Sequence, residues 1–209
     1  MSQSAKAEDL RDWITRHLDP LEDREPAAGV QLDTIGGFPF EGTPAPAAVL
    51  IGLVDRPQGY TVLLTRRADT LKRHTGQIAL PGGRRDPGET PWETALREAE
   101  EEIGLERRFV ELAGLSTPML TRTGYLITPV VGFIGEGFHL DANPGEVADI
   151  FETPFGFLMD PANHEEHVAE LEGQQRRYYA MTHADRYIWG VTAGILRELY
   201  QRLYGAALA

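Results

Sequence analysis

The chain has 209 residues, 42% of them hydrophobic, and a formal net charge of −12. This length and composition allow one sizeable hydrophobic core. The negative charge disfavours a nucleic-acid-binding protein, because such binding normally rests on a basic patch. If the substrate carries phosphates, we expect divalent cations to bridge them to the protein.

The chain contains no cysteine, which excludes disulfides, thiolate nucleophiles and cysteine-ligated zinc. Its longest apolar run, residues 45–54, is far shorter than the roughly 20 residues that a membrane span needs. The first residues lack the apolar region of a signal peptide. We therefore expect a cytoplasmic protein that binds neither membranes nor nucleic acid.

Residues 7–18 place apolar side chains at helical spacing, which predicts a short amphipathic helix. Proline and glycine residues then mark a loop-rich segment. We expect a helix and loop extension over residues 1–40, ahead of one main domain over residues 41–209. The helix could pack on its own domain or serve in a homodimer.

The main domain alternates strand-like and helical patterns. Residues 47–54 and 60–67 predict a β-hairpin, with the proline and glycine of a turn between them. Further β-rich segments are residues 109–116 and 126–134. Residues 187–204 carry apolar side chains at helical spacing and predict a C-terminal helix. The whole pattern indicates a mixed α/β chain, of the α+β kind, in one compact unit.

The helix before residue 109 has unusually clear ends. Thr90 can cap its free N–H groups, Pro91 suits the first helical position and Glu93 completes a capping box. Gly104 can adopt the left-handed conformation that ends a helix. The sequence therefore predicts a helix that begins near Thr90 and stops at Gly104.

Carboxylates crowd the last turns of this helix. A step of about 100° per residue puts Glu98, Glu101 and Glu102 on one face, with Glu100 pointing elsewhere. Like charges at these spacings cost roughly 0.2–0.5 kcal/mol per pair, and the helix dipole adds a further cost. A solvated acidic face is one interpretation. The other is a site for a hard divalent cation, which prefers carboxylate and carbonyl oxygens; Glu89 before the helix and the turn at residues 81–83 favour it.

The pattern resembles the Nudix box, Gly-x5-Glu-x7-Arg-Glu-U-x-Glu-Glu-x-Gly-U, where U is apolar. It fits at every position, with Ala99 as a small residue at an apolar one. The matching residues are Gly83, Glu89, Arg97, Glu98, Ala99, Glu101, Glu102, Gly104 and Leu105.

The resemblance implies the Nudix fold, a mixed β-sheet sandwiched between helices with a loop-helix-loop catalytic motif. It also implies that Glu98, Glu101 and Glu102 hold Mg²⁺ or Mn²⁺, with Glu89 in support and the backbone turn at Gly82 nearby. Arg97 would orient the carboxylates.

Residues 63–83 resemble the signature that precedes the box in coenzyme A pyrophosphatases. Lys72 replaces an arginine and Leu80 a phenylalanine of that signature. Its basic residues could bind the phosphates of coenzyme A, although they could also serve solubility or pair with the acidic excess. The expected substrate-binding residues are Arg66, Arg67, Lys72, Arg73 and Gly76.

The resemblance implies hydrolysis of coenzyme A to 3′,5′-ADP and 4′-phosphopantetheine, and acyl derivatives could serve too. The general base is Glu101 or, as the second choice, Glu146. The alternatives are a Nudix hydrolase of ADP-ribose or another nucleoside diphosphate derivative, and a nucleotide sensor that cuts nothing. Sensors typically lose box carboxylates, whereas this chain keeps all four.

Overall fold

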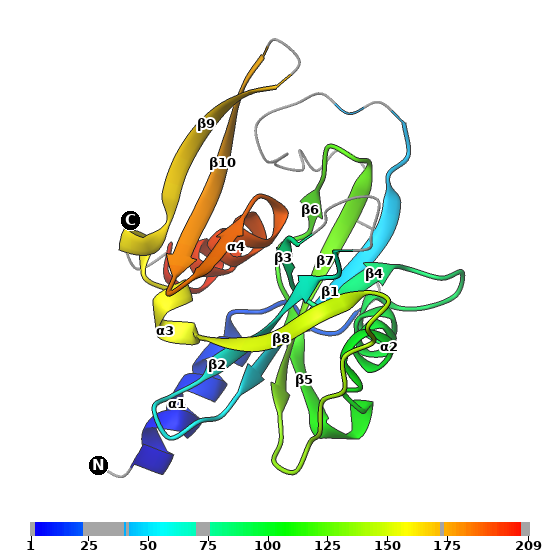
Figure 1. Ribbon diagram of the computed structural model, residues 1–209. Coiled ribbons are helices and arrows are strands. Elements are labelled where there is room, and N and C mark those ends of the chain that lie inside the picture. The colour runs from blue at the N-terminus through cyan, green and yellow to red at the C-terminus, as the bar shows by residue number, and fades with distance from the viewer. Residues whose placement is uncertain (1–2, 23–39, 41, 70–75, 172–173, 206–209) are drawn as a thin grey trace.

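The computed structural model describes the chain except for residues 1–2, 23–39, 41, 70–75, 172–173 and 206–209 (Figure 1). The helices are α1 (Gln3–Arg16), α2 (Pro91–Ile103), α3 (Phe155–Leu158) and α4 (Val191–Tyr204), with the 3-10 turns η1 (Arg107–Phe109) and η2 (Pro161–Asn163). The strands are β1 (Ala45–Val54), β2 (Thr61–Arg67), β3 (Ile78–Ala79), β4 (Gly82–Arg84), β5 (Val110–Leu115), β6 (Met119–Leu120), β7 (Tyr125–Ile134), β8 (Val147–Pro154), β9 (Glu165–Leu171), β10 (Gln174–His183) and β11 (Arg186–Trp189).

The larger sheet is mixed. Strand β1 runs parallel to β7 along its whole length and antiparallel to β2 and β4. The hydrogen-bonded path is β3-β2-β1-β7-β5, with β8 on the free side of β2. A smaller antiparallel sheet, in the order β11-β10-β9, stands beside it (Figure 1).

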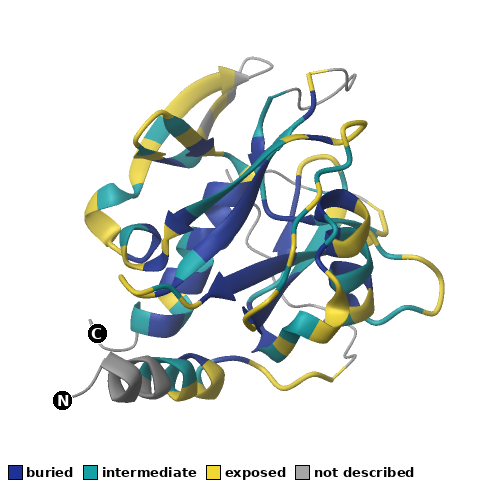
Figure 2. Cartoon of the chain, turned by 60° about the horizontal axis from the view of Figure 1, so that its bottom comes forward, coloured by how far each residue is buried: buried dark blue, intermediate teal, exposed yellow. Residues whose placement is uncertain are grey.

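Both faces of the larger sheet are buried, as the alternation along β1 shows. Leu50 and Val54 join the core under α2, whereas Ile51 and Leu53 join the core formed with α1, α3 and α4. Since successive side chains of a strand point to opposite faces, the sheet must be covered on both sides. Figure 2 shows its strands buried between the helices. The predicted sandwich of a mixed sheet between helices is confirmed.

Helix α1 packs on its own domain. Ile14 and Leu18 are buried in the core that contains α4, and the ring centroid of Trp13 lies 4.8 Å from that of Tyr204. Arg202 on α4 donates a 2.6 Å hydrogen bond to the carbonyl of His17. No helix in the described part of the chain is long and apolar enough to cross a bilayer.

The prediction of one helix over residues 187–204 is wrong at its start. Residues 186–189 form strand β11, and Gly190, with a φ of 65°, separates this strand from α4. Ile188 is buried from the strand, and Val191 is exposed on the helix. The apolar spacing mimicked one helix because a short strand with one buried residue runs directly into an amphipathic helix.

Candidate active site

Helix α2 has a fixed register because both of its ends are capped. Thr90 and Glu93 form the reciprocal hydrogen bonds of a capping box, and Gly104 ends the helix in the left-handed conformation with a φ of 68°. Ala95, Ala99 and other small or apolar residues pack on the sheet. The carboxylate face is therefore held along strand β4, and the predicted helix is confirmed.

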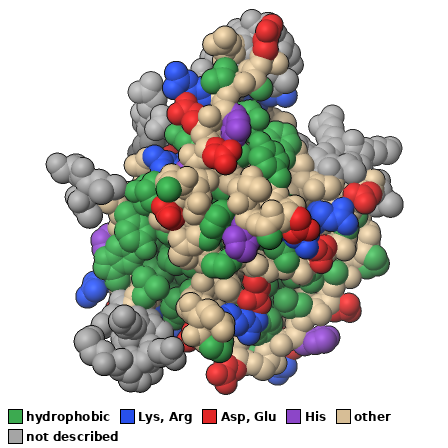
Figure 3. All heavy atoms as spheres, turned by 60° about the vertical axis from the view of Figure 1, so that its left-hand side comes forward, with side chains coloured by type: hydrophobic (Ala, Val, Ile, Leu, Met, Phe, Trp, Pro, Cys, Tyr) green, Lys and Arg blue, Asp and Glu red, His purple; other side chains and the backbone are tan. Residues whose placement is uncertain are grey.

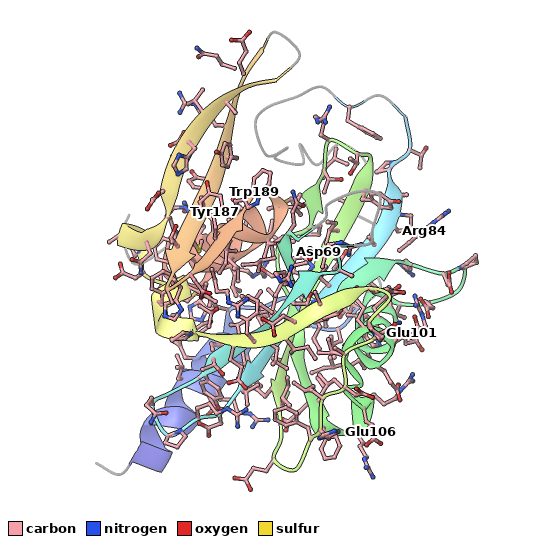
Figure 4. The ribbon with its side chains drawn as sticks, viewed as in Figure 1. Asp69, Arg84, Glu101, Glu106, Tyr187 and Trp189 are labelled. Carbon is pink, nitrogen blue, oxygen red and sulfur yellow. The ribbon has the colours of Figure 1, made fainter. Side chains whose placement is uncertain are left out.

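Arg97 joins three of the predicted carboxylates. Its guanidinium donates hydrogen bonds to Glu89 at 2.7 and 3.1 Å, to Glu98 at 2.9 Å and to Glu101 at 3.1 Å. It also donates to the carbonyl of Arg84 on β4 at 3.2 Å. Figure 4 labels Arg84 and Glu101, which come from β4 and α2. This geometry suits an arginine that orients carboxylates.

Glu89 is the most firmly held member of the group. The hydrogen bond from Arg97 is the main cause that lowers its pKa to about 2, and the hydroxyl of Thr94 and the N–H of Asp86 contribute further hydrogen bonds. A carboxylate with these partners stays ionised at every physiological pH. Sequence reasoning missed the hydrogen bond that Thr94 donates to Glu89.

The pKa of Glu102 is shifted in the opposite direction from that of Glu89. Glu102 is only 4% exposed, and it accepts one hydrogen bond, at 3.2 Å from the N–H of Gly82. Burial raises its pKa to about 7, and the negative charges of Glu98 and Glu146 act in the same direction. Among the described residues, no cation forms an ion pair with Glu102. Burying a carboxylate without an ion-pairing partner costs free energy. An oxygen-preferring cation bound to Glu102 would offset that cost.

Glu98 lies against the backbone of β4. A Cβ atom added to Gly83 would come within 2.5 Å of the Glu98 carboxyl carbon. Burial is the main cause that raises the pKa of Glu98. The glycine of the box therefore leaves the space in which the Glu98 carboxylate sits.

Gly83→Ala is expected to displace Glu98 and lower kcat at least about tenfold, while the domain stays folded. Gly156→Ala is the matched control, because a Cβ there would meet nothing within 4 Å. Steady-state hydrolysis and a thermal melt of both variants test this. Equal activity of Gly83→Ala and wild type would show that Glu98 does not need this space.

Glu146 is held near the carboxylates by its backbone. Its carbonyl accepts from the N–H of Ala68 at 2.8 Å, and its N–H donates to the carbonyl of Asn143 at 3.0 Å. Asn143 in turn donates from its N–H to the carbonyl of Glu102 at 2.9 Å. The loop is thus tied to both α2 and the end of β2, an anchoring role of Asn143 that sequence reasoning missed.

The predicted basic residues are only partly brought to the site. The charge of Arg67 acts on Glu102, and the Arg67 Nε is buried without a hydrogen-bond partner in the part of the chain that the structure describes. Arg66 instead pairs with Asp69 at 3.1 Å, and Gly76 makes the turn before β3 with a φ of 68°. Two further predicted residues, Lys72 and Arg73, lie outside the described residues.

The donor set fits a hard divalent cation. Across the described ranges, no three acidic or histidine side chains already surround one point. Arg97 instead donates hydrogen bonds to Glu98 and Glu101, and the Gly82 N–H donates one to Glu102. Glu98, Glu101 and Glu102 nevertheless supply oxygen donors from one helix, α2, and such donors are what Mg²⁺ and similar ions require. A bound ion would neutralise substrate oxygens and lower the pKa of a water.

Comparison with known proteins decides the family. The model of the NUDIX domain matches residues 43–176. The chain belongs to the Nudix hydrolases. As such it hydrolyses pyrophosphate bonds in nucleoside diphosphate derivatives, which are small molecules, and Nudix hydrolases generally use divalent metal ions.

Two relatives match this chain over most of their own length and most of its length, and neither name states a substrate. The uncharacterized Nudix hydrolase NudL of Photorhabdus laumondii is 41% identical over 158 residues, which cover 75% of this chain and 84% of the relative. The NudL protein of Yersinia pestis is 39% identical over 165 residues, which cover 78% and 82%. The solved MutT protein of Methanosarcina mazei aligns with a TM-score of 0.50 and 17% identity over 82% of this chain and all of that one, a likeness of fold.

Proposed function

We propose that this Nudix hydrolase cuts the pyrophosphate bond of coenzyme A and its derivatives, giving 3′,5′-ADP and 4′-phosphopantetheine. Glu98, Glu101 and Glu102 hold Mg²⁺ or Mn²⁺, with the Gly82 backbone nearby and Glu89 in support. The sequence signature over residues 63–83 supports this substrate, since it resembles that of coenzyme A pyrophosphatases.

The position and environment of Arg67 are the structural observation that carries the proposal. Arg67 lies at the end of β2, within the signature, and its charge acts on the buried carboxylate of Glu102. Its Nε lacks a partner among the described residues. A buried polar atom normally has a hydrogen-bond partner, and a substrate phosphate beside the metal would give the Nε of Arg67 one.

Different residues of the chain orient the carboxylates and accept the proton from water. Arg97 orients the carboxylates, and the base must reach the attacking water. Glu101 is hydrogen-bonded to Arg97 at 3.1 Å. Among the described residues, the Glu146 carboxylate makes no hydrogen bond, although its charge acts on Glu98 and Glu102. This freedom favours Glu146 over Glu101 as the group that accepts the proton.

A substrate panel tests the proposed function. Coenzyme A, ADP-ribose and NADH are each incubated with enzyme and Mg²⁺, and the phosphorylated products are identified by mass spectrometry. We expect the highest kcat/KM with coenzyme A. A clear preference for ADP-ribose would replace the coenzyme A assignment by the alternative, a hydrolase of ADP-ribose or another nucleoside diphosphate derivative.

Three further features remain proposals. The domain division places a helix and loop extension at residues 1–40 before the hydrolase domain at 41–209. The second proposal is a homodimer formed through this extension. Its test is the light-scattering mass before and after deletion of residues 1–20. The third is a cytoplasmic location, without membrane or nucleic-acid partners.

A further inference from the structure

The smaller sheet carries an exposed set of aromatic side chains. Strand pairing puts Tyr178, Tyr187 and Trp189, here called the aromatic face, on one side of β10 and β11. Met181 and Ile188 point to the other side and enter the main core. Tyr187 is 43% exposed and Trp189 is 39% exposed. Figure 4 labels both on β11.

The aromatic face is already arranged for binding. The ring of Trp189 stacks on Tyr187 with centroids 6.4 Å apart, and it meets the edge of Tyr178 at 5.8 Å. His167 on β9 stacks on Tyr178 at 5.4 Å. Because these rings support one another, a ligand would find a preformed surface and pay little ordering entropy.

Charge argues against a phosphate at this surface. Glu165 lies on the same side of the sheet and contacts His167 at 3.1 Å. Burial and the hydroxyl of Tyr178 raise the pKa of Tyr187, and the negative charge of Glu165 acts in the same direction. Figure 3 shows acidic, basic and hydrophobic side chains together on the projecting β9–β10 hairpin. The aromatic face suits an uncharged, apolar group.

The strand that carries Tyr187 and Trp189 of the aromatic face packs on β3, which precedes the active-site strand β4 in the chain. Strand β11 packs against β3, and just after Trp189 the hydroxyl of Thr192 donates to the carbonyl of Ile78 at 2.9 Å. Ile78 precedes Gly82 by four residues, at most about 13 Å of extended chain. A long flexible arm of a substrate held at Gly82 can therefore reach Ile78, and β11 lies beside the strand that contains Ile78.

We propose that the aromatic face binds the apolar acyl group at the far end of an acyl-coenzyme A substrate. This inference rests on the proposed function and adds a second contact to it. Arg67 and the metal ion hold the phosphates, while the aromatic rings hold the uncharged hydrocarbon chain. The enzyme therefore selects longer acyl derivatives over free coenzyme A.

A series of substrates tests the selection directly. KM and kcat are measured with coenzyme A and with its acetyl, butanoyl, hexanoyl and octanoyl derivatives. Burial of each methylene favours binding by up to about fourfold, so we expect KM to fall at least about tenfold from acetyl to octanoyl. A KM that does not depend on chain length overturns the proposal.

Variants then assign the effect to the aromatic face. Trp189→Ala and Tyr187→Ser should each raise KM for the octanoyl substrate about fivefold to tenfold and change KM for coenzyme A less than twofold. Val168→Ser is the control, because Val168 is 57% exposed on the opposite side of the same hairpin. Equal changes for both substrates would indicate a structural effect and overturn the assignment.

The outcomes separate this inference from the proposed function. An enzyme that prefers ADP-ribose and cuts no coenzyme A refutes the proposed function and the inference with it. An enzyme that cuts coenzyme A without chain-length preference refutes only the inference. A dimer by light scattering that becomes monomeric in Trp189→Ala would assign the face to a second copy and overturn the acyl site.

Discussion

Glu102→Gln should lower kcat by roughly a hundredfold to a thousandfold and make the metal-free protein more stable at pH 8. The loss of activity follows because an amide is a poor replacement for a charged metal-binding oxygen, and loss of one well-placed electrostatic group typically has this effect. The gain in stability follows from burial: ionised Glu102 is only 4% exposed and has no ion pair among the described residues.

The direction of the pH dependence follows from the raised pKa. The pKa of Glu102 goes from its ordinary 4.5 to about 7, so the folded protein binds more protons than the unfolded chain between these values. Stability of the metal-free wild type therefore falls as pH rises from 4.5 to 7, by on the order of 3 kcal/mol. In Glu102→Gln, the free energy of unfolding should not show this decrease between pH 4.5 and 7.

Thermal melts of metal-free protein between pH 5 and 8 measure the effect, with kcat measured on the same samples in Mg²⁺. Glu100→Gln is the matched control, because Glu100 is exposed and pairs with Arg107 at 3.5 Å, away from the carboxylate face. A Glu102→Gln protein with near wild-type kcat would remove Glu102 from the catalytic group.

Arg97→Leu should destabilise the protein by about 2 kcal/mol at pH 7 and lower activity about tenfold to a hundredfold. Arg97 donates hydrogen bonds to Glu89, Glu98 and Glu101, and without it these carboxylates repel one another. The stability figure follows from the lowered pKa of Glu89, reduced for solvent screening. Loss of an orienting partner typically costs a metal site this much activity.

The pH dependence of this variant has the opposite sign. Because the pKa of Glu89 is lowered from 4.5 to about 2, its stabilising contribution is complete above pH 4.5 and is lost as pH falls toward 2. The difference between wild type and Arg97→Leu should therefore shrink below pH 4.5. Melts at pH 3 and 7 measure it, with Arg107→Leu as the exposed control; a difference that stays constant would contradict the assignment.

Sequence reasoning worked best where local signals were complete. Helix α2 was predicted at both ends because Thr90, Glu93 and Gly104 are local capping residues whose hydrogen bonds depend on near neighbours. The crowding of Glu98, Glu101 and Glu102 could likewise be read from helical geometry. These features need no knowledge of distant parts of the chain.

The long-range contacts could not be read in the same way. The approach of Glu146 to Glu98 and Glu102 depends on backbone hydrogen bonds from Asn143 and Ala68, and no side-chain pattern reports such bonds. The space beneath Glu98 depends on how closely β4 approaches α2. Both are properties of packing, so they appear only in three dimensions.

The smaller sheet was missed for a related reason. Strands β9 and β10 carry charged and polar residues on both sides near their ends, because much of the hairpin projects into solvent. The alternation that marks a half-buried strand is therefore weak. The same weakness concealed β11, whose single buried residue, Ile188, was assigned to the following helix.

Titration with Mn²⁺, followed by calorimetry, tests most directly whether the crowded carboxylates on α2 form the metal site. Wild type and Glu100→Gln should bind the ion equally well, while Glu98→Gln and Glu102→Gln should bind it at least about tenfold more weakly. Equal Mn²⁺ affinity in all four proteins would contradict a metal site on this face of α2.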